Sequence, residues 1–266
     1  MKVDFTFPFG KKVRPVEQTD RSRKKVFVLG VYASAVHAKW ISPKGDVTVK
    51  ALAVASEPNI FWRGEGAETI VGEITIPSEV GRLEPADETL NGPSGRALDR
   101  HFLEPLRLNR SDAWLCDLVP HTCLNKRQMS AIETKYDPIR LRHGLPKVTI
   151  PEVPPKLADD NRRREIIEEI RLAQPRLIVL LGDQPIKWFL KPLEAHPSSR
   201  LSDFTRQRPY GEVFTLPLDG KQFNFLLLVH PRQAAGLSSH SANWKDVHRT
   251  WTKNRAKHIK KDYLLN

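Results

Sequence analysis

RLIVLLG (residues 176–182) has five consecutive apolar residues between an arginine and a glycine. An unbroken apolar run of this length predicts a strand that is buried on both faces. The flanking segments predict helices. In residues 159–175, Asp159 or Asp160 stands at the start of the predicted helix, and Pro175 follows its end. Residues 184–195 carry a proline in the first turn of the second helix. We therefore expect a helix, a buried strand and a second helix in succession.

The same alternation of strands and helices extends over most of the chain. Further apolar runs predict strands at residues 24–30, 47–55, 113–120, 211–218 and 222–231. Helices are predicted at residues 94–106, at 126–144 with a break at Pro138, and at 241–261. Residues 56–93 are rich in Gly, Pro and acidic residues and predict a long loop. The pattern is typical of an α/β fold, a three-layer α/β/α arrangement around a central, mostly parallel sheet.

Length and composition favour one globular domain. The chain has 266 residues, of which 39% are hydrophobic. We expect a basic N-terminal arm at residues 1–24, a single domain at residues 25–266, and a monomer. No apolar run reaches the roughly 18 residues of a membrane span, and no signal-peptide pattern opens the chain. Cys116 and Cys123 predict neither a disulfide framework nor a zinc site, so we expect a reducing, cytoplasmic location.

The charge of the chain points to a polyanionic partner. The formal net charge is +12, and both ends are basic. Such an excess attracts phosphates over a long range, so we expect DNA as the partner and a place at the nucleoid. Among the C-terminal cations, we expect Lys257, Lys260 and Lys261 to contact the backbone of DNA. The alternative is a pair of solvated tails, but Trp251 within the C-terminal run favours a packed helix.

Several common sites are missing from the sequence. It has no GxxxxGK[ST] loop and no GxGxxG after a strand, which argues against a nucleotide cofactor. The nine histidines show no HxxxH or HExxH spacing, which argues against a metal enzyme. We therefore expect no cofactor and no metal. What remains is three predicted strands that end in Gly30, Asp117 and His230, where ligands of α/β folds bind.

Two of these strand ends carry a family resemblance. VFVLGVYASAVHAKW (26–40) and FLLLVHPRQAAGL (225–237) resemble, in this order, the two active-site motifs of the uracil-DNA glycosylase superfamily. The first is a glycine at a strand end followed by a short loop, and the second is a His-Pro loop before the last helix. RLIVLLG is also similar to an apolar strand of that family. The resemblance covers roughly residues 24–258 and implies a uracil-DNA glycosylase-like fold and cleavage of bases from DNA.

The first motif departs from the family pattern. Many members carry Asp, Asn or Glu just after the glycine, and this residue positions the attacking water. Residues 31–35 contain no such side chain. We expect Asn91 or Glu57 to take this role, with Asp117 as a further candidate. The alternative is that Asn91 and Glu57 are turn or capping residues.

The remaining candidates follow from the chemistry that the resemblance implies. A departing base develops negative charge, which the imidazole of His230 can stabilise as a hydrogen-bond donor. The alternative for His230 is a residue that merely packs at a strand end. Phe61 and Trp62 are candidates for stacking on the base, with loop packing as the alternative. Further candidates for the base pocket are Gly30, Tyr32, Ser34, His37 and Asp117, and candidates for DNA contact are Arg232 and Gln233.

Three functions remain open. The first is a monofunctional DNA glycosylase that excises a modified or unusual base, flipped out of double-stranded or present in single-stranded DNA, in repair or in defence against phages with modified DNA. The second is a nucleic-acid-binding protein of the same fold without catalysis, which the missing carboxylate after Gly30 favours. The third is a hydrolase of free nucleosides or nucleotides, which the net charge of +12 disfavours.

Overall fold

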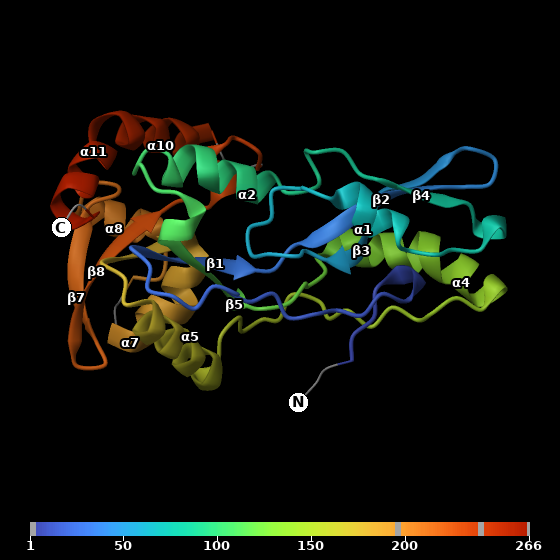
Figure 1. Cartoon of the computed structure of the whole chain (residues 1–266), viewed down its shortest axis with the longest axis horizontal. Helices are drawn as coiled ribbons and strands as arrows, with labels where there is room; N and C mark the ends of the chain where they lie inside the picture. Colours follow the sequence, from blue (N-terminus) through green and yellow to red (C-terminus); the bar gives the residue numbers. More distant parts are fainter. Residues whose placement is uncertain (1–3, 195–197, 239–241, 265–266) are drawn as a thin grey trace. The chain divides into compact units, whose positions relative to one another are not determined.

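The computed structural model describes residues 4–194, 198–238 and 242–264 (Figure 1). Contacts between Cα atoms divide the chain into two compact units. Unit 1 comprises Met1–Val16, Tyr32–Pro93 and Pro120–Pro155, and unit 2 comprises Glu17–Val31, Ser94–Val119 and Lys156–Asn266. The division into a basic arm at residues 1–24 and a single domain at residues 25–266 stays a prediction.

Unit 2 is built on a five-stranded sheet with the order β5-β1-β6-β8-β7. Its strands are β1 (Val26–Tyr32), β5 (Ala113–Val119), β6 (Leu177–Leu181), β7 (Val213–Leu218) and β8 (Lys221–Leu228). β6 runs parallel to both β1 and β8, and β7 forms an antiparallel hairpin with β8. Every residue of β5 and β6 is buried, as their unbroken apolar sequences predict. The mostly parallel sheet is therefore confirmed.

Helices cover the sheet of unit 2. The longer ones are α2 (Pro93–Leu98), α5 (Asp160–Ala173), α8 (Leu201–Gln207) and α10 (Ala242–Asn254). The short helices and turns are η3 (Asp99–Leu103), η4 (Arg110–Asp112), α6 (Asp183–Pro185), η6 (Ile186–Leu190), α7 (Lys191–Glu194), α9 (Pro231–Ala234), α11 (Ala256–Ile259) and η7 (Lys260–Leu264). In Figure 1, α2 and α10 lie on one side of the sheet, and α5 and α7 lie on the other. This arrangement confirms the α/β class that the sequence predicts.

Local signals set the ends of several helices. Asp159 caps α5 as predicted, because its carboxylate accepts a hydrogen bond of 2.8 Å from the main-chain N–H of Arg162. The predicted helix at residues 241–261 is wrong as one helix, because it is interrupted at Arg255 between α10 and α11. The predicted limits at Ala195 and Ser241 lie outside the described residues.

Unit 1 contains a three-stranded antiparallel sheet with the order β3-β2-β4. Its strands are β2 (Ala35–Ile41), β3 (Val47–Ser56) and β4 (Arg82–Pro85). Its helices and helical turns are η1 (Pro8–Gly10), α1 (Ala67–Gly72), η2 (Ser78–Val80), α3 (Lys126–Ala131), η5 (Ile132–Tyr136) and α4 (Asp137–His143). The prediction of a loop at residues 56–93 is wrong in part, because α1 and β4 lie there. Pro138 falls in the first turn of α4, where it breaks no hydrogen bond of that helix.

The core of unit 1 is aromatic and includes the start of the chain. Phe7, Trp40 and Tyr136 are fully buried. The ring of Phe9 packs edge-on against Trp40 and Tyr136, with centroids 5.5 and 5.2 Å apart. The main-chain N–H of Phe9 also donates to the Tyr136 hydroxyl at 3.0 Å. Aromatic burial of this kind holds Phe7 and Phe9 in the core of unit 1.

In the part of the chain that the structure describes, no helix is both long enough and apolar enough to cross a membrane.

Candidate functional site

Residues of four neighbouring strands meet at one edge of the sheet in unit 2. β1, β6 and β8 are parallel, so Gly30, Gly182 and His230 lie at the same, carboxyl edge. Asp117 joins them from β5, because its carboxyl group accepts a hydrogen bond from the main-chain N–H of Val31. The order β5-β1-β6-β8 puts three strand spacings between the outer two strands, about 14 Å at about 4.8 Å each. Asp117 and His230 therefore belong to the outer two of these four strands, with Gly30 and Gly182 between them.

The first turn of α9 sets the orientation of His230. The main-chain N–H of Arg232 donates to Nδ1 of His230 at 3.3 Å. In return, the main-chain N–H of His230 donates to the side-chain oxygen of Gln233 at 3.3 Å. Pro231 occupies the first position of the helix, where its missing N–H costs nothing. Since Nδ1 accepts a hydrogen bond, the proton of a neutral His230 ring is on Nε2.

His230 is neutral near pH 7. Burial, with the nearby charge of Arg232 as the smaller cause, lowers the pKa of His230 to about 4. A neutral ring with its proton on Nε2 can donate a hydrogen bond without carrying a positive charge. The group at the end of β8 is therefore a fixed, uncharged hydrogen-bond donor.

Gly182 gives His230 the room to lie against the end of β6. Its φ is +87°, in the region that favours glycine, and its N–H donates to the carbonyl oxygen of Leu228 at 2.7 Å. A Cβ atom at this position would lie 3.3 Å from Cβ of His230. The close contact between the ends of β6 and β8 therefore depends on the absence of a side chain at residue 182.

Asp117 is the buried acid at this edge. Desolvation, with a smaller effect of the Glu169 charge, raises the pKa of Asp117 to about 7, although Arg162 opposes the shift. A carboxyl group in this range exchanges its proton near neutral pH, as a general base does. Asp117 is also next to β1, the strand that contains Gly30, where the first motif has no acid of its own.

Arg162 on α5 holds the end of β5 and was not predicted from the sequence. Its guanidinium donates to the carbonyl oxygens of Asp117 and Leu118, at 2.7 and 3.2 Å. It also pairs with Glu169 at 3.4 Å. Arg162 and Glu169 are seven residues apart, on the same face as the buried Ile166. The sequence signal that could have identified this pair is the presence of two charged residues on the otherwise apolar face of α5.

In unit 1, Glu57 and Ser34 come together. The carboxylate of Glu57 accepts a hydrogen bond of 2.9 Å from the main-chain N–H of Ser34, and Glu57 is buried. The hydroxyl of Thr122 donates to the carbonyl oxygen of Ser34 at 2.8 Å. Tyr32 is half-buried, two residues before Ser34. Glu57 therefore supports the turn between β1 and β2.

Asn91 and His37 also come together in unit 1. The side-chain oxygen of Asn91 accepts from the main-chain N–H of His37 at 2.8 Å, and its amide nitrogen donates to the carbonyl oxygens of His37 and Ala86. Nε2 of His37 lies 3.2 Å from the amide nitrogen of Gln128. Both ends of the Asn91 amide thus bind main chain, as in a structural bridge.

Phe61 and Trp62 lie inside unit 1. Trp62 is 3% exposed and Phe61 is 7% exposed. The indole N–H of Trp62 donates to the carbonyl oxygen of Glu65 at 2.9 Å, and Phe61 has a positive φ of 53°. Both rings are buried in unit 1, and their role in stacking on a base stays a prediction.

A row of cations runs along the C-terminal helices. Exposed basic side chains recur at every fourth residue from α10 to η7, at Lys245, Arg249, Lys253, Lys257 and Lys261. His248 and Trp251 face the interior from the same helix. Lys260 is half-buried beside this row. We call the five exposed residues the basic row, and its spacing keeps them on one face within α10.

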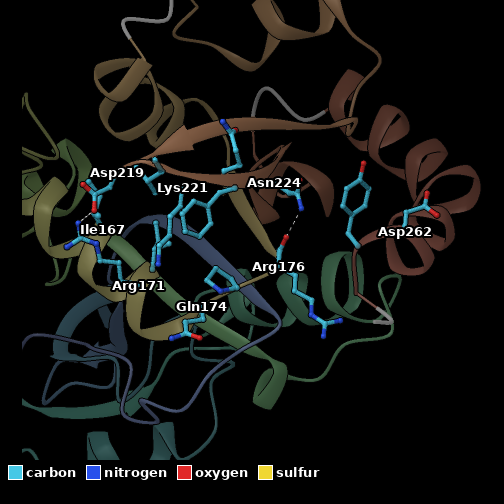
Figure 2. A pocket seen from close by; sticks show the side chains of 14 residues that line it. Ile167, Arg171, Gln174, Arg176, Asp219, Lys221, Asn224 and Asp262 are labelled. Atoms are coloured by element: carbon cyan, nitrogen blue, oxygen red, sulfur yellow. Dashed lines mark hydrogen bonds and ion pairs between the residues drawn. The ribbon is translucent and has the colours of Figure 1, made fainter.

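A pocket lies elsewhere, at the opposite edge of the sheet. Its volume is about 640 Å³, and it is lined by the end of α5, the β7–β8 hairpin and η7 (Figure 2). Its polar groups bind one another: Arg171 forms an ion pair with Asp219, and the Asn224 amide donates to the carbonyl oxygen of Arg176 at 3.1 Å. None of the candidate residues lines this pocket.

Comparison with known protein families identifies a match to this chain. The family model for the uracil DNA glycosylase superfamily matches residues 84–253, more than half of the chain. The matched range contains Asp117 and His230, whereas Gly30 and Glu57 precede it. No curated protein matches the sequence.

Proposed function

Because the chain belongs to the uracil-DNA glycosylase superfamily, we propose that it is a monofunctional DNA glycosylase. It hydrolyses the N-glycosidic bond of a base that has left the DNA stack, since the bond is out of reach inside a duplex. The observation that carries the proposal is the neutral, oriented imidazole of His230 at the carboxyl edge of the sheet. Ligands of open α/β sheets bind at that edge.

His230 stabilises the departing base. When the C1′–N bond breaks, its electron pair moves to the base, and negative charge develops on the oxygen of the base. The Nε2–H of His230 donates a hydrogen bond to that oxygen. The donor is held in place before the reaction by α9, so little reorganisation is needed.

Asp117 receives the proton of the attacking water. Water forms the new bond to C1′, its proton passes to the Asp117 carboxylate, and the base is later protonated by solvent. The negative carboxylate also stabilises positive charge on the sugar. We place Asp117 ahead of Glu57 and Asn91, because the side chains of those two bind main-chain groups of unit 1.

We also propose that the target is a modified or unusual base. No acidic or amide side chain directly follows Gly30, where many members of the family carry one, and this departure supports a target other than ordinary uracil. Removal of such a base would serve repair or defence against phages with modified DNA, and either role places the protein on DNA in the cytoplasm.

A panel of oligonucleotides tests the function. Single- and double-stranded DNA would carry one uracil, hydroxymethylcytosine or glucosylated cytosine, with the unmodified sequence as the control. After incubation and heating in alkali, a strand break at one modified position shows base loss. Binding to all of the DNAs without a break in any of them would favour the non-catalytic binding protein.

We expect the C-terminal lysines, two from the basic row and the neighbouring Lys260, to hold DNA. Changing Lys257, Lys260 and Lys261 to Gln should weaken binding to any sequence, because these side chains contact phosphates. Each lost phosphate contact reduces the slope of log K against log salt by about 0.9 for duplex DNA. Fluorescence anisotropy at several salt concentrations measures both quantities. The control changes Lys126, Lys135 and Lys147, exposed lysines of unit 1, and so removes the same charge. Equal losses in both triple variants would argue against a specific role of the C-terminal lysines.

A further inference from the structure

A chain of three hydrogen bonds ends next to His230. The main-chain N–H of Val229 donates to the hydroxyl of Tyr210 at 3.1 Å. The Tyr210 hydroxyl lies 2.7 Å from Nδ1 of His248, and Nε2 of His248 lies 2.8 Å from the carbonyl oxygen of His101. We call this the Tyr210–His248 chain. It connects His248 of α10 and His101 of η3 to Val229, the residue after β8.

The chemistry of the donors fixes the direction of each bond. An amide N–H can only donate, so the Tyr210 hydroxyl accepts from Val229 and gives its own proton to Nδ1 of His248. Nε2 of His248 then carries the ring proton and donates it to the carbonyl oxygen of His101. Burial lowers the pKa of His248 to about 4, which keeps the ring in the neutral form that this arrangement needs.

Aromatic packing holds both side chains of the chain in place. The His248 ring is 1% exposed and lies 4.4 Å from the Phe102 ring and 5.0 Å from the Trp251 ring, between centroids. The Trp251 indole N–H donates to the carbonyl oxygen of Gly211, the neighbour of Tyr210, at 3.1 Å. The hydroxyl of Tyr210 therefore has little freedom to move away from Val229.

Val229 is the first residue after the main-chain pairing of β8 with β6 ends. The parallel pairing of β6 with β8 ends at Leu181 and Leu228, one residue earlier. Val229 is 1% exposed, so its N–H needs a partner inside the protein. Tyr210 supplies that partner immediately before His230.

We propose that Tyr210 and His248 are positioning residues that fix the main chain at Val229 and thereby set where His230 meets the departing base. This inference rests on the proposed function. It also links two parts of that function, because α10 carries His248 on its inner face and three residues of the basic row on its outer face. Phosphate binding to α10 would therefore fix the helix whose His248 supports, through Tyr210, the main chain just before His230.

Tyr210→Phe tests the proposal, because it removes only the hydroxyl. We expect single-turnover base release to slow about 10- to 100-fold, the range that small displacements of a catalytic group can cost, with an unchanged Kd for DNA. The substrate is the oligonucleotide that the panel identifies. The matched control is Tyr136→Phe in unit 1, whose hydroxyl also accepts from a main-chain N–H, that of Phe9, and donates to a carbonyl oxygen, that of Pro146. We expect the control to lose comparable stability and keep the wild-type rate.

A second measurement needs no substrate. In ¹⁵N-histidine-labelled protein without DNA, the ring nitrogens of His230 should report one tautomer, with the proton on Nε2. Tyr210→Phe should shift or broaden these signals, and Tyr136→Phe should leave them unchanged. If the wild-type protein releases no base from any DNA, the proposed function fails, and the ¹⁵N signals still decide whether Tyr210 positions His230.

A pair of His248 variants covers the case in which Tyr210→Phe does not fold. His248→Gln keeps an acceptor for the Tyr210 hydroxyl, whereas His248→Leu does not. We expect the Gln variant to retain more of the rate and of the His230 signal than the Leu variant. Equal behaviour of the two His248 variants, or equal rates and unchanged His230 signals in both Tyr variants, would overturn the proposal.

Discussion

We expect the His230→Ala variant to release base about 100- to 1,000-fold more slowly than the wild type, the typical cost of losing one preorganised donor to a developing anion. Its Kd for DNA should stay the same, because phosphate contacts supply most of the affinity. Single-turnover kinetics under saturating enzyme measure the rate, and anisotropy measures the Kd. The neutral state of His230, with its pKa at about 4, means that this loss should be independent of pH between pH 6 and 9.

The capping role of His230 needs its own control. Alanine removes the acceptor for the N–H of Arg232, and loss of such a cap costs about 0.5–2 kcal/mol of stability. His230→Asn keeps a good capping group but lacks the imidazole. We expect the Asn variant to be closer to the wild type in thermal unfolding and as inactive as the Ala variant. An unstable Ala variant with a normal rate per folded molecule would mean that His230 only packs at the strand end.

The second large effect is expected for Asp117→Asn. Loss of a general base typically costs about 100- to 10,000-fold in rate. Asparagine has nearly the same shape and keeps an oxygen for the N–H of Val31, so we expect the variant to fold. The rate is measured by single-turnover base release on the oligonucleotide that the panel identifies.

The pH profile gives Asp117 a second signature. The active form is the carboxylate, whose fraction rises as pH increases through its pKa of about 7. The wild-type rate should therefore increase with pH and level off above pH 8, and the Asn variant should lack this rise. A wild-type rate that instead falls through pH 7 would mean that the protonated acid is the active form. Glu57→Gln and Asn91→Ala check the ranking: a loss per folded molecule as large as that of Asp117→Asn would move the water-activating role to unit 1.

The sheet of unit 2 could be predicted because its strands are defined by local sequence. The run at residues 177–181 is apolar throughout, and only a strand buried on both faces needs such a run. β2 was not predicted, although Val36, Ala38 and Trp40 are buried and alternate with the half-buried His37 and Lys39. This period of two is typical of a half-buried strand, but the burial that it reflects comes from pairing with β3 and β4. β4 has only four residues, and its partner in the sheet is more than 40 residues away.

In the candidate site, too, some residues could be identified from local sequence and others only from contacts between distant residues. His230 could be found because a histidine and a proline directly follow an apolar strand. Tyr210 and His248 could not, because their bonds join residues that are 38 and 19 positions apart in the sequence. The sequence also cannot show that the partners of Glu57 and Asn91 are main-chain groups, which decides whether such a side chain is free for chemistry.

Gly182 limits how this protein could be adapted to a different base. Side chains that face the base can change one at a time, each with its own effect on selectivity. Any side chain at residue 182 would instead press on His230 and adopt a disfavoured φ of +87°. A deep mutational scan would accordingly score Gly182 as intolerant, although the residue offers no group for recognition. Directed evolution of base selectivity should leave this position out of its libraries and vary the side chains that face the base instead.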